Sequence, residues 1–194
     1  MAPKRNILLH TCCAVCLEAV LPPLAEEGFT VTVFFHNPNI HPYREFEKRL
    51  RAVEIAAEVH KLPLLADKEY GLQAYLDEIL GAPEGRCAAC YRVRLEAAAA
   101  AASRGGFGVF TTTLLSSPHQ KHGLVAAAGA AAGSEQKVEF LYRDWRDRMP
   151  HGLEAARRRS LYRQHYCGCI WSEYEAFGPK PRPAGNGSAE LPED

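Results

Sequence analysis

The sequence lacks the features of a membrane-bound or exported protein. No run of about 18 apolar residues occurs without a charged residue, so we expect no transmembrane helix. The segment from Met1 to Arg5 leads directly into a short apolar run and has no hydrophobic signal-peptide core. We therefore expect a cytoplasmic protein that does not associate with membranes.

The chain also lacks an excess of charge of either sign. Its 23 Lys and Arg balance 23 Asp and Glu, so net charge does not direct it toward nucleic acid. Only the segment from Arg143 to Arg163 is locally basic, with seven Arg against three acidic residues. A patch for nucleic acid and a solvated helix face explain this segment equally well. Four aromatic residues that suit base stacking lie within or beside it: Tyr142, Trp145, Tyr162 and Trp171.

Cysteine, in contrast, is abundant, and all seven residues fall into three short-spaced groups. These groups are Cys12, Cys13 and Cys16, then Cys87 and Cys90, then Cys167 and Cys169. In a reducing compartment such spacing indicates metal ligands or catalytic thiols more than structural disulfides. Iron–sulfur clusters and zinc both prefer thiolate ligands, but adjacent ligands are uncommon in structural zinc sites. Four thiols suffice for one cluster, which leaves three for a second metal or a redox-active dithiol.

The remaining pattern predicts an α/β fold, with a mainly parallel sheet flanked by helices. We expect strands at 6–10, 30–35, 61–66, 109–115 and 138–142, and helices at 14–27, 72–80, 86–102 and 118–131. A further long helix should follow Pro42, with an apolar stripe at Phe46, Leu50, Val53 and Ala57. Residues 1–178 are expected to form one domain, and 179–194, rich in Pro, Gly, Ser and acidic residues, a disordered tail.

The carboxyl ends of parallel strands meet at one edge of a sheet, where ligands bind. Cys12, Cys13, Asn37 and Thr111 to Thr113 should therefore approach one crevice. The first group of cysteines is thus predicted to lie at the ligand-binding edge of the sheet.

Five longer motifs in this order are similar to those of the cobalamin-independent epoxyqueuosine reductases, the QueH family. The resemblance covers roughly residues 6 to 178. The motifs are LLHTCCAVC ending at Cys16, FFHNPNIHPY ending at Tyr43, RCAACYRVRL from Arg86, TTTLLSSPHQKH from Thr111, and LYRQHYCGC ending at Cys169. Two positions depart from the expected pattern: Val15 stands where we expect Pro, and His119 stands where we expect Tyr.

The resemblance implies a fold related to nucleotide α-hydrolases and the reduction of epoxyqueuosine to queuosine at the wobble position of tRNA. It implies that Cys12, Cys13, Cys87 and Cys90 hold a 4Fe-4S cluster and that Cys167 and Cys169 form a redox-active pair, either as a disulfide or as ligands of a second, mononuclear iron. Cys16 matches a metal-ligand position and would join that second site. The partners are the tRNA anticodon loop and an electron donor that the sequence does not specify. Candidate proton donors are His10, His36, His41, His119, Tyr43 and Tyr166.

Two other functions stay open at this point. An ATP-dependent tRNA-modifying thiolase has a related fold, but the segment from His10 to Cys16 contains no glycine for a phosphate cradle. A nucleic-acid-binding module with structural zinc or a sensing iron–sulfur cluster would bind a single metal type and would show no turnover.

Overall fold

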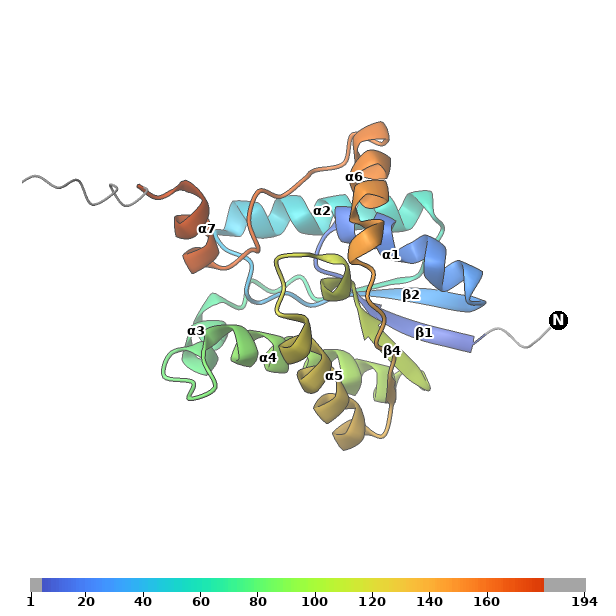
Figure 1. Cartoon of the computed structure of the whole chain (residues 1–194), viewed down its shortest axis with the longest axis horizontal. Helices are drawn as coiled ribbons and strands as arrows, with labels where there is room; N and C mark the ends of the chain where they lie inside the picture. Colours follow the sequence, from blue (N-terminus) through green and yellow to red (C-terminus); the bar gives the residue numbers. More distant parts are fainter. Residues whose placement is uncertain (1–4, 180–194) are drawn as a thin grey trace, which may run out of the picture.

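The computed structural model describes residues 5–179 and contains one five-stranded sheet flanked by helices (Figure 1). The strand order is β3-β2-β1-β4-β5, and every pair is parallel, which confirms the expected fold class. The strands are β1 (Arg5–His10), β2 (Phe29–Phe35), β3 (Leu64–Ala66), β4 (Val109–Thr112) and β5 (Glu139–Phe140).

Helices cover both faces of the sheet. In Figure 1, α1, α2 and α6 lie on one side of the strands, and α3, α4 and α5 lie on the other. Their bounds, with the remaining helices, are α1 (Ala14–Glu26), α2 (Tyr43–Val59), α3 (Leu72–Ile79), α4 (Arg86–Arg104), η1 (Thr113–Ser116), α5 (His122–Gln136), η2 (Arg146–Arg148), α6 (Met149–Arg158) and α7 (Ile170–Phe177).

The central strand supplies the middle of the hydrophobic core. Ile7, Leu8 and Leu9 of β1 are completely buried, as expected for a strand that has neighbours on both sides and helices on both faces. The chain then turns within three residues into α1, whose first N–H groups are capped by Cys13: its Sγ accepts a hydrogen bond from the Cys16 backbone N–H. The first cysteine group therefore lies at the carboxyl edge of the sheet.

Several elements differ in length from the prediction: the strands predicted at 61–66 and 138–142 are shorter, at Leu64–Ala66 and Glu139–Phe140. Two further differences follow from local hydrogen bonds. The strand predicted at 109–115 ends at Thr112, since Thr112 Oγ1 accepts a hydrogen bond from the Leu114 backbone N–H and starts η1. The helix predicted at 118–131 begins at His122 and continues to Gln136, because the residues before it form a turn in which Gln120 N donates to Ser117 O.

The C-terminal helices α6 and α7 were not predicted. Helix α6 packs directly on α1 at Gly152, where an added Cβ would lie 2.5 Å from the Val15 carbonyl oxygen and 2.8 Å from Ala19 Cβ. The predicted disordered tail, 179–194, lies almost entirely outside the described residues. Within the described chain, no helix combines the length and the apolar character that a membrane span requires.

Candidate metal centre

The first three cysteines form a compact group of buried thiols. The sulfur atoms of Cys12, Cys13 and Cys16 all lie within 4.8 Å of one another, and the three residues are between 1% and 9% exposed. Cys12 and Cys13 belong to the turn after β1, and Cys16 lies in the first turn of α1. This spacing is compatible with shared ligation of one metal centre.

Neighbouring polar groups donate hydrogen bonds to these sulfurs. Thr113 Oγ1 donates to Cys12 Sγ at 3.3 Å, and Gln164 Nε2 donates to Cys13 Sγ at 2.9 Å. The turn itself is fixed by Cys12 N, which donates to Thr113 Oγ1, and by Asn37 Nδ2, which donates to the Thr11 carbonyl. These contacts show that the ends of β1, β2 and β4 meet at the same edge of the sheet.

The three thiols cannot ionise independently. Hydrogen bonds from the Cys13 and Cys16 thiols hold the pKa of Cys12 well below its usual value. Burial raises the pKa of Cys13, and the hydrogen bond of Cys16 to Cys12 raises the pKa of the Cys16 thiol. Binding of a metal ion replaces the thiol protons and so favours the ionised form of such a group.

The second group lies at the start of α4, which follows Gly85, a residue with φ +84°. Cys90 is 7% exposed and packs with Tyr75 and Ile79 of α3. Burial raises the pKa of Tyr75 above its ordinary range. Cys87 is half-buried at the mouth of the same region.

The third group lies on an irregular segment between α6 and α7. Cys167 is exposed and Cys169 is half-buried. The segment is held from α2 by Arg49, whose Nη1 and Nη2 donate to the carbonyls of Cys167 and Tyr166, each at 2.9 Å. The His41 N–H also donates to Gly168 O at 2.8 Å.

One buried side chain connects the three groups. Arg94 of α4 is 1% exposed, and the thiols of Cys90, Cys12 and Cys167 all act on its guanidinium electrostatically. Burial lowers the pKa of Arg94, but these sulfurs outweigh that effect and raise it overall. Thiols from three segments distant in sequence therefore all contribute to the electrostatic environment of Arg94.

The residues of this region fit a negatively charged metal–thiolate group. Arg94 Nε is buried without a hydrogen-bond partner, and no carboxylate of the described residues pairs with this side chain. An uncompensated buried cation is costly, so the site is complete only when the nearby thiols carry negative charge. Thiolate ligation of a metal centre supplies that charge.

The predicted proton donors have different environments. His10 is buried, with Nδ1 2.7 Å from Thr112 Oγ1 and Nε2 3.2 Å from His36 O, and burial lowers the pKa of His10 to about 3. Burial also lowers the pKa of His41 to about 4, and its Nε2 has no partner. Tyr166 donates to the His41 carbonyl, and His36 Nδ1 lies 2.8 Å from Asp67 Oδ2. Tyr43 and His119 are exposed.

The basic segment between Arg143 and Arg163 is largely neutralised by ion pairs. Five of its seven arginines pair with carboxylates: Arg143, Arg146, Arg148, Arg157 and Arg159. Trp145 is 4% exposed and belongs to the core, whereas Trp171 packs near Cys90 beneath the Arg86 guanidinium. Of the aromatic residues suited to stacking, only Tyr142, Tyr162 and Trp171 retain accessible surface.

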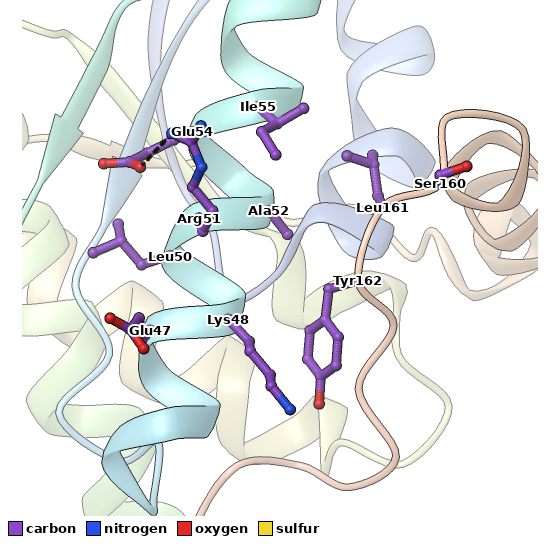
Figure 2. A pocket seen from close by; sticks show the side chains of 10 residues that line it. All are labelled: Glu47, Lys48, Leu50, Arg51, Ala52, Glu54, Ile55, Ser160, Leu161 and Tyr162. Atoms are coloured by element: carbon purple, nitrogen blue, oxygen red, sulfur yellow. Dashed lines mark hydrogen bonds and ion pairs between the residues drawn. The ribbon is translucent and has the colours of Figure 1, made fainter.

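A groove of about 600 Å³ lies on the outer side of α2 and contains none of the cysteines (Figure 2). Lys48 and Tyr162 face each other across it, with Lys48 Nζ 5.5 Å from the ring centroid. Leu50, predicted to be core, is half-buried and lines this groove. The buried face of α2 instead includes Glu45 and Arg49.

Sequence reasoning did not identify Arg49, Arg94, Tyr75 and Gln164 as site residues. Two of them had a recognisable signal: Arg94 follows Cys90 by four residues, and Arg49 follows Glu45 by four, spacings that place side chains on one helix face. Gln164 and Tyr75 had no such signal, since their partners are distant in sequence.

Comparison with known proteins shows a consistent set of relatives. The family described as "Epoxyqueuosine reductase QueH" matches residues 7–175. A protein of Dehalococcoides mccartyi with that name is 39% identical over 95% of this chain and 100% of its own length. The protein of that name from Helicobacter pylori is 37% identical over 84% of this chain and 48% of its own length.

Among solved structures, the U34-tRNA thiolase NcsA from Methanococcus maripaludis with its [4Fe-4S] cluster aligns with a TM-score of 0.56. The alignment covers 90% of this chain and 65% of that one at 16% identity. A likeness at this identity supports the fold alone.

Proposed function

This chain belongs to the epoxyqueuosine reductase QueH family, and from that membership we propose that it reduces epoxyqueuosine to queuosine at the wobble position of tRNA. The reaction removes the epoxide oxygen as water and consumes two electrons and two protons. The protein is an oxidoreductase of tRNA modification, and tRNA is its substrate. The match over residues 7–175 and the single sheet support one catalytic domain spanning residues 1–178.

One observation supports this function most strongly: the sulfur atoms of Cys12, Cys13 and Cys16 lie within 4.8 Å of one another in the core, at the carboxyl edge of the sheet. Reductive opening of an epoxide needs an electron carrier beside the bond that breaks, together with a group that stabilises or protonates the departing oxygen. The buried cysteines and the exposed Cys167 together provide sites for the electron carrier and for the group that acts on the departing oxygen. A single structural metal site would not need seven cysteines.

We assign Cys12, Cys13, Cys87 and Cys90 as the ligands of a 4Fe-4S cluster. The proximity of Cys12 to Cys13, and the action of both Cys12 and Cys90 on Arg94, support this assignment. When bound, such a cluster supplies electrons one at a time. Thr113 and Gln164 would orient the ligand sulfurs by the hydrogen bonds that they donate.

Cys167 and Cys169 form the second part of the proposed site, together with Cys16. Cys167 is the one exposed residue among the seven cysteines, although burial of its sulfur raises the pKa of the thiol, and Gln120 Nε2 donates a hydrogen bond to this sulfur at 3.4 Å. A splayed-out base of the anticodon loop would reach this thiol first. The pair would act either as a redox-active disulfide or, together with Cys16, whose sulfur lies beside those of Cys12 and Cys13, as the ligands of a mononuclear iron.

ATP-dependent chemistry is not favoured by the turn after β1. Cys13 Sγ already accepts the N–H of Cys16 at the start of α1, and the turn contains no glycine. A phosphate cradle needs free backbone N–H groups at that place. The likeness to a thiolase therefore concerns the fold and not the reaction.

Anaerobic reconstitution tests the function directly. The protein is loaded with iron and sulfide, incubated with epoxyqueuosine-containing tRNA and dithionite, and the digested nucleosides are analysed by mass spectrometry. We expect loss of one oxygen atom from the modified nucleoside, and Cys169→Ser, measured alongside, should not turn over. A colourless protein with one zinc per chain and no turnover would instead support the nucleic-acid-binding module.

A further inference from the structure

Two arginines are almost completely buried, and only one of them has a carboxylate partner. Arg49 Nε lies 2.6 Å from Glu45 Oε1, and both side chains are less than 9% exposed. Arg94 is 1% exposed and forms no ion pair with any described carboxylate. Its one hydrogen bond to a described side chain runs from Nη2 to Asn37 Oδ1 at 2.7 Å.

The Asn37 contact does not compensate the charge of Arg94. An amide oxygen is neutral, and Asn37 is itself fixed by donating to the Thr11 carbonyl at 2.9 Å. Arg94 Nε has no partner at all. Because a buried charge without a counter-charge is strongly unfavourable, a fold that retains one needs an anion at that place.

The thiols of the three cysteine groups are the groups positioned to supply that anion. Cys90 lies one helical turn before Arg94 on α4, Cys12 follows β1, and Cys167 lies on the segment before α7. All three interact electrostatically with the guanidinium. Positive charge near a metal–thiolate group stabilises the form that carries one more electron.

We propose that Arg94 is the permanent counter-charge of the metal–thiolate group and makes that group easier to reduce. Arg94 is in this view a positioning residue, since it acts through the ligands and does not touch the substrate. Its guanidinium cannot lose its proton at neutral pH, so its effect is the same throughout the reaction cycle. The proposal rests on the function proposed above, because it requires a redox-active metal centre.

The experiment compares Arg94→Met, Arg94→Lys and Arg104→Met with the unaltered protein. Arg104 is an exposed arginine at the far end of the same helix, and the identical substitution there serves as the matched control. Each protein is reconstituted anaerobically, its iron and sulfide content is measured, and the centre is titrated with dithionite while its spectrum is recorded. One electron passes from dithionite to each oxidised centre.

We expect Arg94→Met to shift the reduction potential to a more negative value, whereas Arg94→Lys and Arg104→Met stay close to the unaltered protein. An Arg94→Met protein with full iron content and an unchanged potential would overturn the proposal. If the unaltered protein itself takes up no iron, the function proposed above fails, which is a separate result.

A second measurement is informative even if Arg94→Met takes up no iron. The melting temperatures of the metal-free and loaded proteins are compared for each variant. We expect metal loading to raise the melting temperature of Arg94→Met much less than that of the unaltered protein. The melting temperature of the metal-free variant should change little, because the substitution removes an unpaired buried cation. An equal decrease in both forms would show that Arg94 has only a structural role.

Discussion

The buried cysteines and the C-terminal pair are held in the fold by different means. Cys12, Cys13 and Cys16 lie where a central strand meets a helix, and their positions follow from the hydrophobic core. Cys167 and Cys169 lie on an irregular segment that side chains and backbone groups of other elements hold in place. The first three cysteines are therefore part of the hydrophobic core, whereas the C-terminal pair is held against it by hydrogen bonds.

This difference suits two tasks. A metal centre needs ligands that do not move, because its geometry and potential depend on them. A thiol that meets a large RNA substrate needs exposure and a segment that can adjust. We therefore expect substitutions in the first region to abolish the centre, and substitutions in the second to change its access and its turnover.

The largest effect should separate the four proposed cluster ligands from the C-terminal pair by absorbance. We expect Cys87→Ser to abolish the visible absorbance of the reconstituted protein, because one cluster ligand is lost. Cys169→Ser should keep most of that absorbance and lose turnover. Visible spectra, iron content and nucleoside analysis check both variants, and equal cluster loss in both would contradict the division of roles.

The next largest effect should come from the side chain that holds the C-terminal segment. Arg49→Met leaves Glu45 buried without its cation, so we expect the free energy of unfolding to fall by about 3–5 kcal/mol. Arg51→Met, two residues further along α2 and 70% exposed, should change it by less than about 0.5 kcal/mol.

Urea unfolding of the metal-free proteins measures both changes. The double variant Arg49→Met with Glu45→Leu should recover much of the loss, since no buried charge is then unpaired. If Arg49→Met were as mild as Arg51→Met, the segment would not depend on this contact.

The difference in exposure between the two regions should appear in thiol reactivity. In the metal-free protein we expect iodoacetamide to modify Cys167 on the order of 100-fold faster than Cys13 or Cys16, because the buried thiols react only after local opening. Mass spectrometry of peptides taken at successive times gives the rates. Similar rates at all three positions would mean that the first region is as mobile as the second.

A smaller effect is expected at Gly168, between the two C-terminal cysteines. Its φ is +135°, and an added Cβ would lie 3.1 Å from Asn39 Nδ2 and 3.2 Å from Arg49 Nη1. We expect Gly168→Ala to cost about 1–3 kcal/mol through backbone strain and crowding. Gly108→Ala, where the added Cβ meets nothing within 4 Å, serves as the control and should cost clearly less in the same unfolding measurement.

The sequence was sufficient to predict the sheet and most of its helices. β-branched and apolar runs predicted all five strand positions, and alternation with helices predicted that the strands are parallel. The order of the strands in the sheet was not predicted. Lengths were less accurate where a side chain ended an element, as Thr112 does by accepting the Leu114 N–H. Helix α6 escaped prediction because its packing depends on Gly152 meeting α1, a contact over more than a hundred residues.

The predicted site residues came from residue type and spacing, which is why the prediction included the cysteines and left out the arginines. Nothing in residue type marks Arg94 as buried and Arg104 as exposed, and the spacing of Arg94 from Cys90 was the one available signal. Three of the five ion pairs in the segment from Arg143 to Arg163 join residues within it, whereas the pairs with Glu18 and Glu27 were visible only in three dimensions, because these partners lie far away in sequence.

The central claim is that the cysteines of α4 and of the turn after β1 bind the same iron centre. Diffraction from crystals of the reconstituted enzyme, recorded at the iron absorption edge, tests this claim most directly. The account predicts anomalous density within bonding distance, about 2.3 Å for metal–thiolate pairs, of the sulfurs of Cys12, Cys13, Cys87 and Cys90. Iron bound by Cys12, Cys13 and Cys16 alone, with Cys87 and Cys90 unliganded, would contradict it.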